Sequence, residues 1–181
     1  VMGRRGLSWL EEAFGGSVTK EFLETPVEFP VYMCRDIAHG REDLLLCVDG
    51  SLQSYRMADH VGFVLGSQSG HEITLLYVDT RHGEHSDHKD QARPEEVFAH
   101  CRNLLADNGI SDVRIQDKVI ASHSPEKAIL KEARAGTYAA VAIGRRSEHG
   151  NQYEGLKGLF KNSVSATLFR QLTGAALWIS Y

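Results

Sequence analysis

Several protein classes are excluded by what this 181-residue sequence lacks. Its three cysteines, Cys34, Cys47 and Cys101, form no CxxC pair, so neither a disulfide framework nor a structural zinc site is indicated, and we expect them to be small core hydrophobes. No apolar run approaches the roughly 18–20 residues of a membrane-spanning helix. Twenty Lys and Arg against 24 Asp and Glu give a formal net charge of −4, which offers no basic surface for nucleic acid. These absences predict a cytoplasmic protein with neither a membrane nor a nucleic-acid partner.

Two enzymatic patterns are also missing. The sequence contains no GxxxxGK[ST] phosphate-binding motif and no pair of carboxylates in a clear acid–base setting. We therefore expect no efficient ATPase, and any hydrolysis of ATP should be slow.

From residue 43 onward, short apolar runs alternate with longer segments of helical period, which is typical of a parallel sheet covered by helices. The turn Asp49-Gly50-Ser51 closes the first run. Ser124 and Pro125 resemble a helix start with a capping side chain, and Asn108-Gly109 resembles a helix end. The expected strands span 43–48, 72–78, 113–120, 138–143 and 175–179, and the expected helices span 54–65, 94–108, 124–135 and 163–172. We predict an α/β domain over residues 42–181, with a doubly wound five-stranded parallel sheet and helices on both faces.

The first 38 residues resemble the end of a second such domain. The segment VMGRR at 1–5 is similar to VAIGRR at 141–146, and each is followed by a glycine-containing loop, a Phe, a Ser-Val pair, a helix and a strand. In the first copy that strand is expected at 29–34. This repeat is incomplete at its front, which predicts a helix-strand remnant of a first domain at 1–38 and a chain that is a fragment of a longer tandem protein.

The loop of the first copy has the spacing GxxGx₉GS. Glycines let backbone amides approach an anion, and a helix that starts at the end of the loop adds unpaired amides and a favourable dipole. The second copy keeps the first glycine and the final serine, but Ser147 and Asn162 replace the other two glycines and the loop is five residues longer. The intact loop of the first copy predicts a phosphate-bearing ligand.

This order of elements, the Asp-Gly-Ser turn and the GxxGx₉GS loop resemble the universal stress protein family, in its tandem two-domain form. The resemblance implies an adenine nucleotide alpha hydrolase-like fold that binds ATP together with Mg²⁺. It also implies a role as a stress-response nucleotide sensor and dimerisation through the last strands, here 29–34 and 175–179. It further implies a first-strand acid, Asp49, and an adenine contact at Val78. The loop residues that it implies are Gly144, Asn162 and Ser163 in the second copy and Gly3, Gly6, Gly16 and Ser17 in the first.

Two alternatives stay open. The altered second loop favours a dimerisation module whose nucleotide cleft has degenerated. His82, His85 and His88, three residues apart with Glu84 and Asp87 among them, have spacings that suit a metal ion, but the surrounding loop is polar throughout and a solvated loop is the simpler interpretation.

Overall fold

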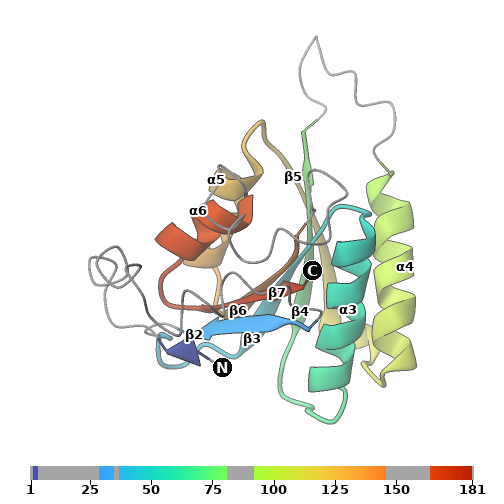
Figure 1. Cartoon of the computed structure of the whole chain (residues 1–181). Helices are drawn as coiled ribbons and strands as arrows, with labels where there is room; N and C mark the ends of the chain where they lie inside the picture. The colour runs from blue at the N-terminus through green and yellow to red at the C-terminus, as the bar shows by residue number, and fades with distance from the viewer. Residues whose placement is uncertain (1, 4–28, 35–36, 81–91, 146–163, 181) are drawn as a thin grey trace.

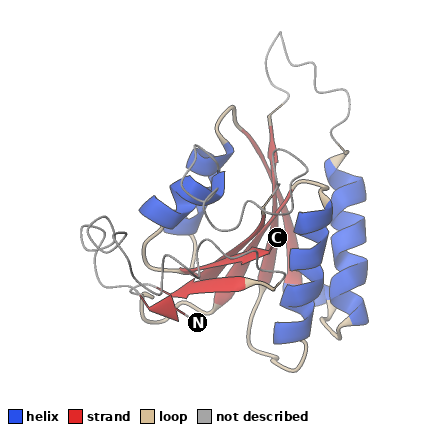
Figure 2. Ribbon diagram, viewed as in Figure 1, coloured by secondary structure: helices blue, strands red, loops and turns tan. Residues whose placement is uncertain are grey.

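The computed structural model describes residues 2–3, 29–34, 37–80, 92–145 and 164–180. In these residues one seven-stranded sheet, with the strand order β1-β2-β7-β6-β3-β4-β5, forms the central layer. Helices α3 and α4 cover one face of the sheet, and helices α5 and α6 cover the other (Figures 1 and 2).

The strands are β1 (Met2–Gly3), β2 (Val31–Cys34), β3 (Asp43–Val48), β4 (Ile73–Asp79), β5 (Ile115–Ala121), β6 (Tyr138–Gly144) and β7 (Ala176–Ser180). The helices are α3 (Leu52–Leu65), α4 (Pro94–Asp107), α5 (Pro125–Ala135) and α6 (Val164–Gln171), with a 3-10 turn, η1 (Asp112–Arg114). The five strands from β3 to β7 are parallel to one another. The predicted doubly wound five-stranded parallel sheet with helices on both faces is therefore confirmed.

Central strand β3 shows why this sequence forms a covered sheet. Successive side chains of a strand point to opposite faces. Accordingly Leu44 and Leu46 pack on the α3/α4 side, whereas Leu45 and Cys47 pack on the α5/α6 side. All four are at most 9% exposed. Both faces of β3 need apolar side chains because helices cover both, which is the pattern of a buried parallel strand.

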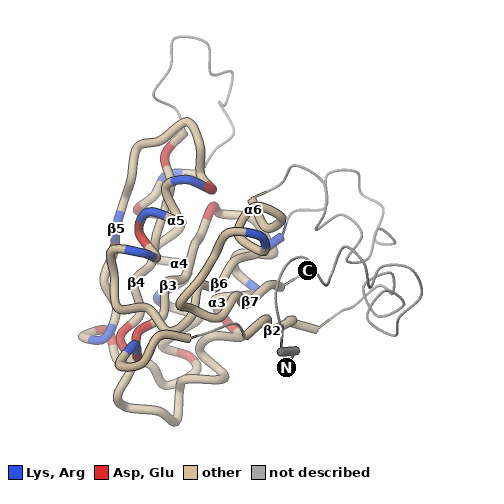
Figure 3. The backbone as a smooth tube through the Cα atoms, turned by 90° about the vertical axis from the view of Figure 1, so that its left-hand side faces the viewer, with Lys and Arg blue, Asp and Glu red and all other residues tan. Residues whose placement is uncertain are grey.

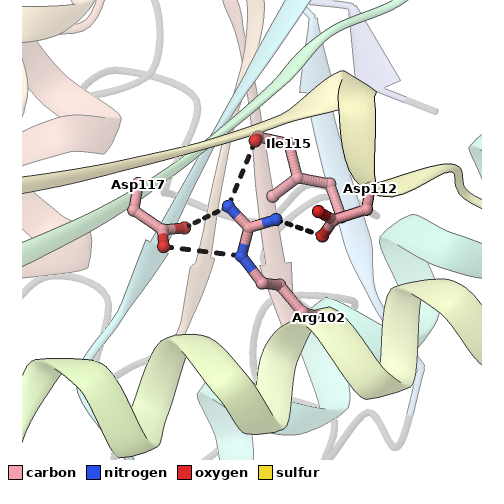
Figure 4. Close-up of polar contacts among 4 residues, drawn as sticks. All are labelled: Arg102, Asp112, Ile115 and Asp117. Carbon is pink, nitrogen blue, oxygen red and sulfur yellow. Dashed lines mark hydrogen bonds and ion pairs between the residues drawn. The ribbon is translucent and has the colours of Figure 1, made fainter.

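The edge strand β5 begins two residues later than predicted. Val113 is not in the strand but in the turn η1, where the residue is 89% exposed. Figure 4 shows the contacts made at this point of the chain: Arg102 of α4 reaches the carboxylate of Asp112 in η1, the Ile115 carbonyl at 3.1 Å and the Asp117 carboxylate at 3.0 Å. One guanidinium thus holds the turn and the start of β5 on α4, and this non-local contact left no local pattern in the sequence.

The start of α5 was predicted correctly, but its capping bond was not. Ser124 is the N-cap residue and Pro125 opens the helix. The Ser124 hydroxyl makes no capping bond and instead donates to the Glu126 carboxylate. In the described residues, basic and acidic positions are interspersed along the backbone (Figure 3). Among the described helices, none has the length and hydropathy to cross a membrane.

Strand β2 joins the sheet by antiparallel pairing with β7, and Tyr32 lies directly opposite Trp178. Their rings meet edge to face with centroids 4.8 Å apart. The Tyr32 hydroxyl also makes a hydrogen bond with Nε2 of His60 on α3. The pairing of the last strands that the resemblance implies is thus present within this one chain.

The contact between Tyr32 and His60 should make the docking of β2 weaker in acid. Burial lowers the pKa of His60 from its ordinary 6.5, and neighbouring Asp59 opposes this only partly. Because the structure favours neutral His60, the stability it contributes is complete above pH 6.5 and declines as the pH falls below that value. We expect the parent protein to lose more thermal stability between pH 7.5 and 5.5 than His60→Gln does, as measured by circular dichroism. An equal loss in the two proteins would contradict this.

Candidate functional site

The ends of three neighbouring strands meet at the point where the strand order reverses. The chain runs from β3 outward to β4 and β5, and then crosses back to β6 and β7 on the other side of β3 (Figure 1). Asp49 follows β3 directly, Val78 is the second-last residue of β4, and Gly144 is the last residue of β6. In open α/β sheets, ligands bind at the carboxyl edge beside such a reversal.

The strand register brings these residues to one level of the sheet. Val48 pairs with Tyr77 in the ladder between β3 and β4, so Asp49 and Val78 each lie one residue further along. Cys47 pairs with Ile143 in the ladder between β3 and β6, so Gly144 lies beside the last residue of β3. The structure therefore gathers Asp49, Val78 and Gly144 at one edge, although 95 positions separate the first from the last in the sequence.

Asp49 anchors the turn into α3. Its Oδ1 accepts hydrogen bonds from the Ser51 amide at 2.9 Å and from the Ser51 hydroxyl at 2.6 Å. Gly50, between them, has a φ of +80°, and a Cβ there would lie 3.0 Å from Cβ of Ala92. Glycine is therefore needed for both its left-handed conformation and the close approach of the segment that leads into α4.

Helix α3 begins at this turn with its amino end at the candidate site. Ser51 is the N-cap residue, and its hydroxyl oxygen accepts from the Ser54 amide at 3.2 Å. The Ser54 hydroxyl donates back to the Ser51 carbonyl at 2.8 Å. The first turn itself carries no acidic side chain, but the Asp49 carboxylate bonded to Ser51 lies directly before it and offsets part of the positive end of the helix dipole. The site next to the turn thus combines a carboxylate acceptor with a helix amino end.

Gly144 lies against the backbone of that same helical turn. A Cβ on Gly144 would be 2.3 Å from the carbonyl carbon of Gln53 and 2.3 Å from the amide nitrogen of Ser54. Just beyond it, the Arg145 amide donates to the Ser180 carbonyl at 2.9 Å, and the Ser180 hydroxyl donates to the Gln53 carbonyl at 2.7 Å. The end of β6, the end of β7 and the first turn of α3 are thus in direct contact.

Gln53 and Ser180 were not among the predicted site residues. Ser180 ends an otherwise apolar strand, ALWIS, and is 3% exposed. A buried hydroxyl is normally hydrogen-bonded, so a serine at the end of such a strand was a usable signal. Nothing local in the sequence identified its partner, the Gln53 carbonyl, because 127 positions separate the two residues.

Val78 has a half-buried side chain that packs against the core on the α5/α6 side. The strand end around it is fixed on both sides. The Ser122 amide donates to the Asp79 carbonyl at 2.9 Å, and the Tyr77 hydroxyl donates to the Ala92 carbonyl at 2.9 Å. The backbone at the end of β4 is therefore held in place beside Asp49.

The ionisable groups behind the turn are held neutral. Burial raises the pKa of Tyr55 above its ordinary 10, and the negative charges of Asp49 and Glu96 reinforce this. Burial likewise raises the pKa of the Cys47 and Cys101 thiols. Of the three cysteines predicted to be core hydrophobes, Cys47 and Cys101 are buried, whereas Cys34 is only partly buried. Neither buried cysteine is a thiolate available for nucleophilic chemistry at neutral pH.

Several predicted residues lie outside the described residues, namely Gly6, Gly16, Ser17, Asn162 and Ser163, together with the metal-site candidates His82, His85 and His88. Gly3 is described and ends β1, where it pairs with Cys34 of β2. Within the ranges that the structure describes, no group of three His, Cys, Asp or Glu side chains could hold a metal ion.

Comparison with known proteins points to one family. Residues 40–175 match the family model described as the Universal stress protein family. A universal stress protein from Archaeoglobus fulgidus DSM 4304 superposes with a TM-score of 0.66 at 19% identity, over 99% of this chain and 59% of that longer chain. No curated protein sequence is similar enough to this chain to count as a match.

Two further structures cover 77% of this chain. One is a universal stress protein in complex with cAMP, with a TM-score of 0.58, 15% identity and 96% of its own length covered. The other is a universal stress protein family protein from Arabidopsis thaliana with AMP bound, with a TM-score of 0.51, 14% identity and 90% of its length covered. At these identities the superpositions show a shared fold.

Proposed function

The chain belongs to the universal stress protein family, and on that basis we propose that it binds an adenine nucleotide, with ATP and Mg²⁺ as the expected ligand, at the edge formed by the ends of β3, β4 and β6. The observation that carries the proposal is the convergence of Asp49, Val78 and Gly144 at the sheet reversal, beside the amino end of α3. Nucleotides bound to two proteins of the same fold, cAMP in one and AMP in the other, support an adenine nucleotide as the ligand class.

The residues fit the separate parts of such a ligand. Asp49 is an acceptor and suits ribose hydroxyls or an adenine amine rather than phosphate, which it would repel. The end of β4 at Val78 offers backbone groups for the adenine. The family resemblance assigns ribose and phosphates to the loop that starts at Gly144 and includes Asn162 and Ser163, with Gly3, Gly6, Gly16 and Ser17 as its counterparts in the first copy.

Changing Asp49 to asparagine should weaken ATP binding about tenfold. Asparagine keeps one side-chain oxygen to accept the two bonds from Ser51, so the turn can persist, but it replaces the other carboxylate oxygen by a donor. A lost charge-assisted hydrogen bond accounts for about 1.4 kcal/mol, or a factor of ten. The control is Asp107→Asn, which makes the same chemical change at the carboxyl end of α4. Isothermal titration with ATP and Mg²⁺ measures both; equal affinities would remove Asp49 from the site.

The altered second loop favours a second candidate, a dimerisation module with a degenerate cleft. Ser147 and Asn162 stand where the first copy has Gly6 and Gly16, and the loop is five residues longer. A β-carbon at either position narrows the approach of a phosphate to the backbone. Titration heat from ATP in the parent protein would reject this candidate, and its absence would favour it over nucleotide sensing.

We also propose that residues 1–38 are the end of a first domain of this type and that residues 42–181 are the second. Aligning Ser17-Val18 with Ser163-Val164 makes Cys34 equivalent to Ser180. Gly3 pairs with Cys34 in the structure, as Gly144 pairs with Ser180, so the two copies share one register.

The ladder between β2 and β7 has the symmetry expected of two equivalent domains. In the same alignment Tyr32 is equivalent to Trp178, and these two residues face each other. The flanking pairs are Val31 with Ile179 and Met33 with Leu177. In the alignment Val31 is equivalent to Leu177 and Met33 to Ile179, so exchanging the two copies turns each flanking pair into the other. An isologous contact of this kind is what a twofold relation between equivalent strands produces. The longer Archaeoglobus fulgidus protein, 59% of which this chain spans, supports the two-domain proposal.

The protein would then act in the cytoplasm as a stress-response sensor whose nucleotide state influences assembly. We propose that the β2–β7 ladder is the dimerisation contact of the family, formed here within one chain and open to exchange between two. Light scattering tests this. A mass of two or more chains at micromolar concentration supports exchange, and a single-chain mass overturns it.

A further inference from the structure

Ser180 makes a hydrogen bond to α3 that belongs neither to the proposed nucleotide-binding loop nor to the Asp49 turn. It is the last residue of β7, is 3% exposed, and pairs with Gly144 at the end of the β6–β7 ladder. Its carbonyl accepts from the Arg145 amide at 2.9 Å, and its hydroxyl donates to the Gln53 carbonyl at 2.7 Å. One residue therefore bonds to the end of β6 through its backbone and to α3 through its side chain.

The bonded position on α3 is the turn that carries the candidate site. Gln53 follows Leu52, the first residue of the helix, and precedes Ser54, whose amide is capped by Ser51. Ser51 in turn holds Asp49 through two hydrogen bonds. A movement of Gln53 would therefore displace the Asp49 turn, because the helix backbone and the hydrogen bonds of Ser51 connect Gln53 to Asp49.

The Ser180 bond also sets the distance between α3 and β6. The missing side chain of Gly144 lets the two backbones approach to a separation at which a Cβ would lie 2.3 Å from the helix. Close approach alone does not fix the rotation of the helical turn, whereas a directional hydrogen bond to one carbonyl does. The Ser180 hydroxyl, at the end of β7, makes that directional hydrogen bond.

We propose that Ser180 is a positioning residue of the nucleotide site, which fixes the first turn of α3 against the end of β6 through its hydrogen bond to Gln53. The inference rests on the proposed nucleotide function, since it concerns the same site. Ser180 need not touch the nucleotide. It acts through Gln53, Ser51 and Asp49.

The test compares Ser180→Ala with Tyr138→Phe, a matched loss of one buried hydroxyl at the opposite edge of the sheet. The Tyr138 hydroxyl is bonded to Glu132 at 3.0 Å and to Thr74 at 3.2 Å, away from the candidate site. Three quantities are measured: the melting temperature, the affinity for ATP with Mg²⁺ by isothermal titration, and the hydrogen exchange of the Ser54 and Tyr55 amides without nucleotide.

Both variants should lower the melting temperature, but only Ser180→Ala should speed exchange at Ser54 and Tyr55 and weaken ATP binding, by about 5- to 10-fold. Unchanged exchange at these amides overturns the proposal, and so does unchanged affinity. If the parent protein binds no ATP, the proposed nucleotide function fails, and the exchange result alone then decides the positioning of α3 by Ser180.

Discussion

Gly144→Ala should destabilise the protein by about 2–3 kcal/mol and abolish most nucleotide binding. The added Cβ would lie 2.3 Å from two backbone atoms of Gln53 and Ser54, so no side-chain rotation can relieve the clash. The end of β6 and the first turn of α3 must separate, and overpacking of this kind carries a cost in that range. For a protein of this size we expect the melting temperature to fall by roughly 5–10 °C.

Gly70→Ala is the matched control for this change. Gly70 also lies outside the left-handed region, and a Cβ there meets no atom within 4 Å. Its melting temperature and its ATP affinity should equal those of the parent. Thermal unfolding by circular dichroism and titration with ATP measure both variants. If Gly144→Ala melts with the parent and binds as tightly, the close contact between β6 and α3 does not exist in solution.

A chain shortened by the removal of residues 1–38 should form a dimer through the uncovered edge of its own β7. Without β2, strand β7 has an uncovered edge beside Trp178, and such edges recruit another strand. The β2–β7 ladder is symmetric about the Tyr32–Trp178 pair, so a second copy of β7 can take the place of β2 in the same antiparallel register. We expect light scattering to give twice the mass of the shortened chain.

Trp178→Lys in the shortened chain provides the control for this dimer. A lysine pair at the symmetry point would bring two like charges together and remove the aromatic contact, so the double change should give a single-chain mass. A shortened chain that stays monomeric without this substitution would show that β7 does not pair with its own copy. The proposed twofold relation between the two domains would then lose its main support.

Much of the fold followed from periodicity. The apolar run 43–48 has to be a central strand because both of its faces need covering, and the same argument placed β4, β6 and β7 to within one residue. The turn at Asp49 and the end of α4 at Asn108 were recognisable because glycine at 50 and 109 marks left-handed backbone. The late start of β5 was not predictable, since it depends on Arg102, ten residues or more from its partners.

The candidate site was predictable only in part, for the same reason. Asp49, Val78 and Gly144 each stand at the end of an apolar run, and the carboxyl ends of parallel strands share an edge, so their convergence follows from the sequence. The contacts that fix their spacing do not. The Ser180–Gln53 bond and the approach of Gly144 to α3 join segments about 90 residues or more apart, and only the assembled sheet brings them together.

Amide chemical shifts during an ATP titration test the central claim most directly, because they report where the nucleotide binds as well as whether it does. With Mg²⁺ present, ATP should move the signals of Asp49, Gly50, Val78 and Gly144, while those of Thr74 and Tyr138, at the amino ends of β4 and β6, should stay in place. Shifts confined to the amino edge, or no shifts at millimolar ATP, would contradict the assignment of this sheet edge as a nucleotide site.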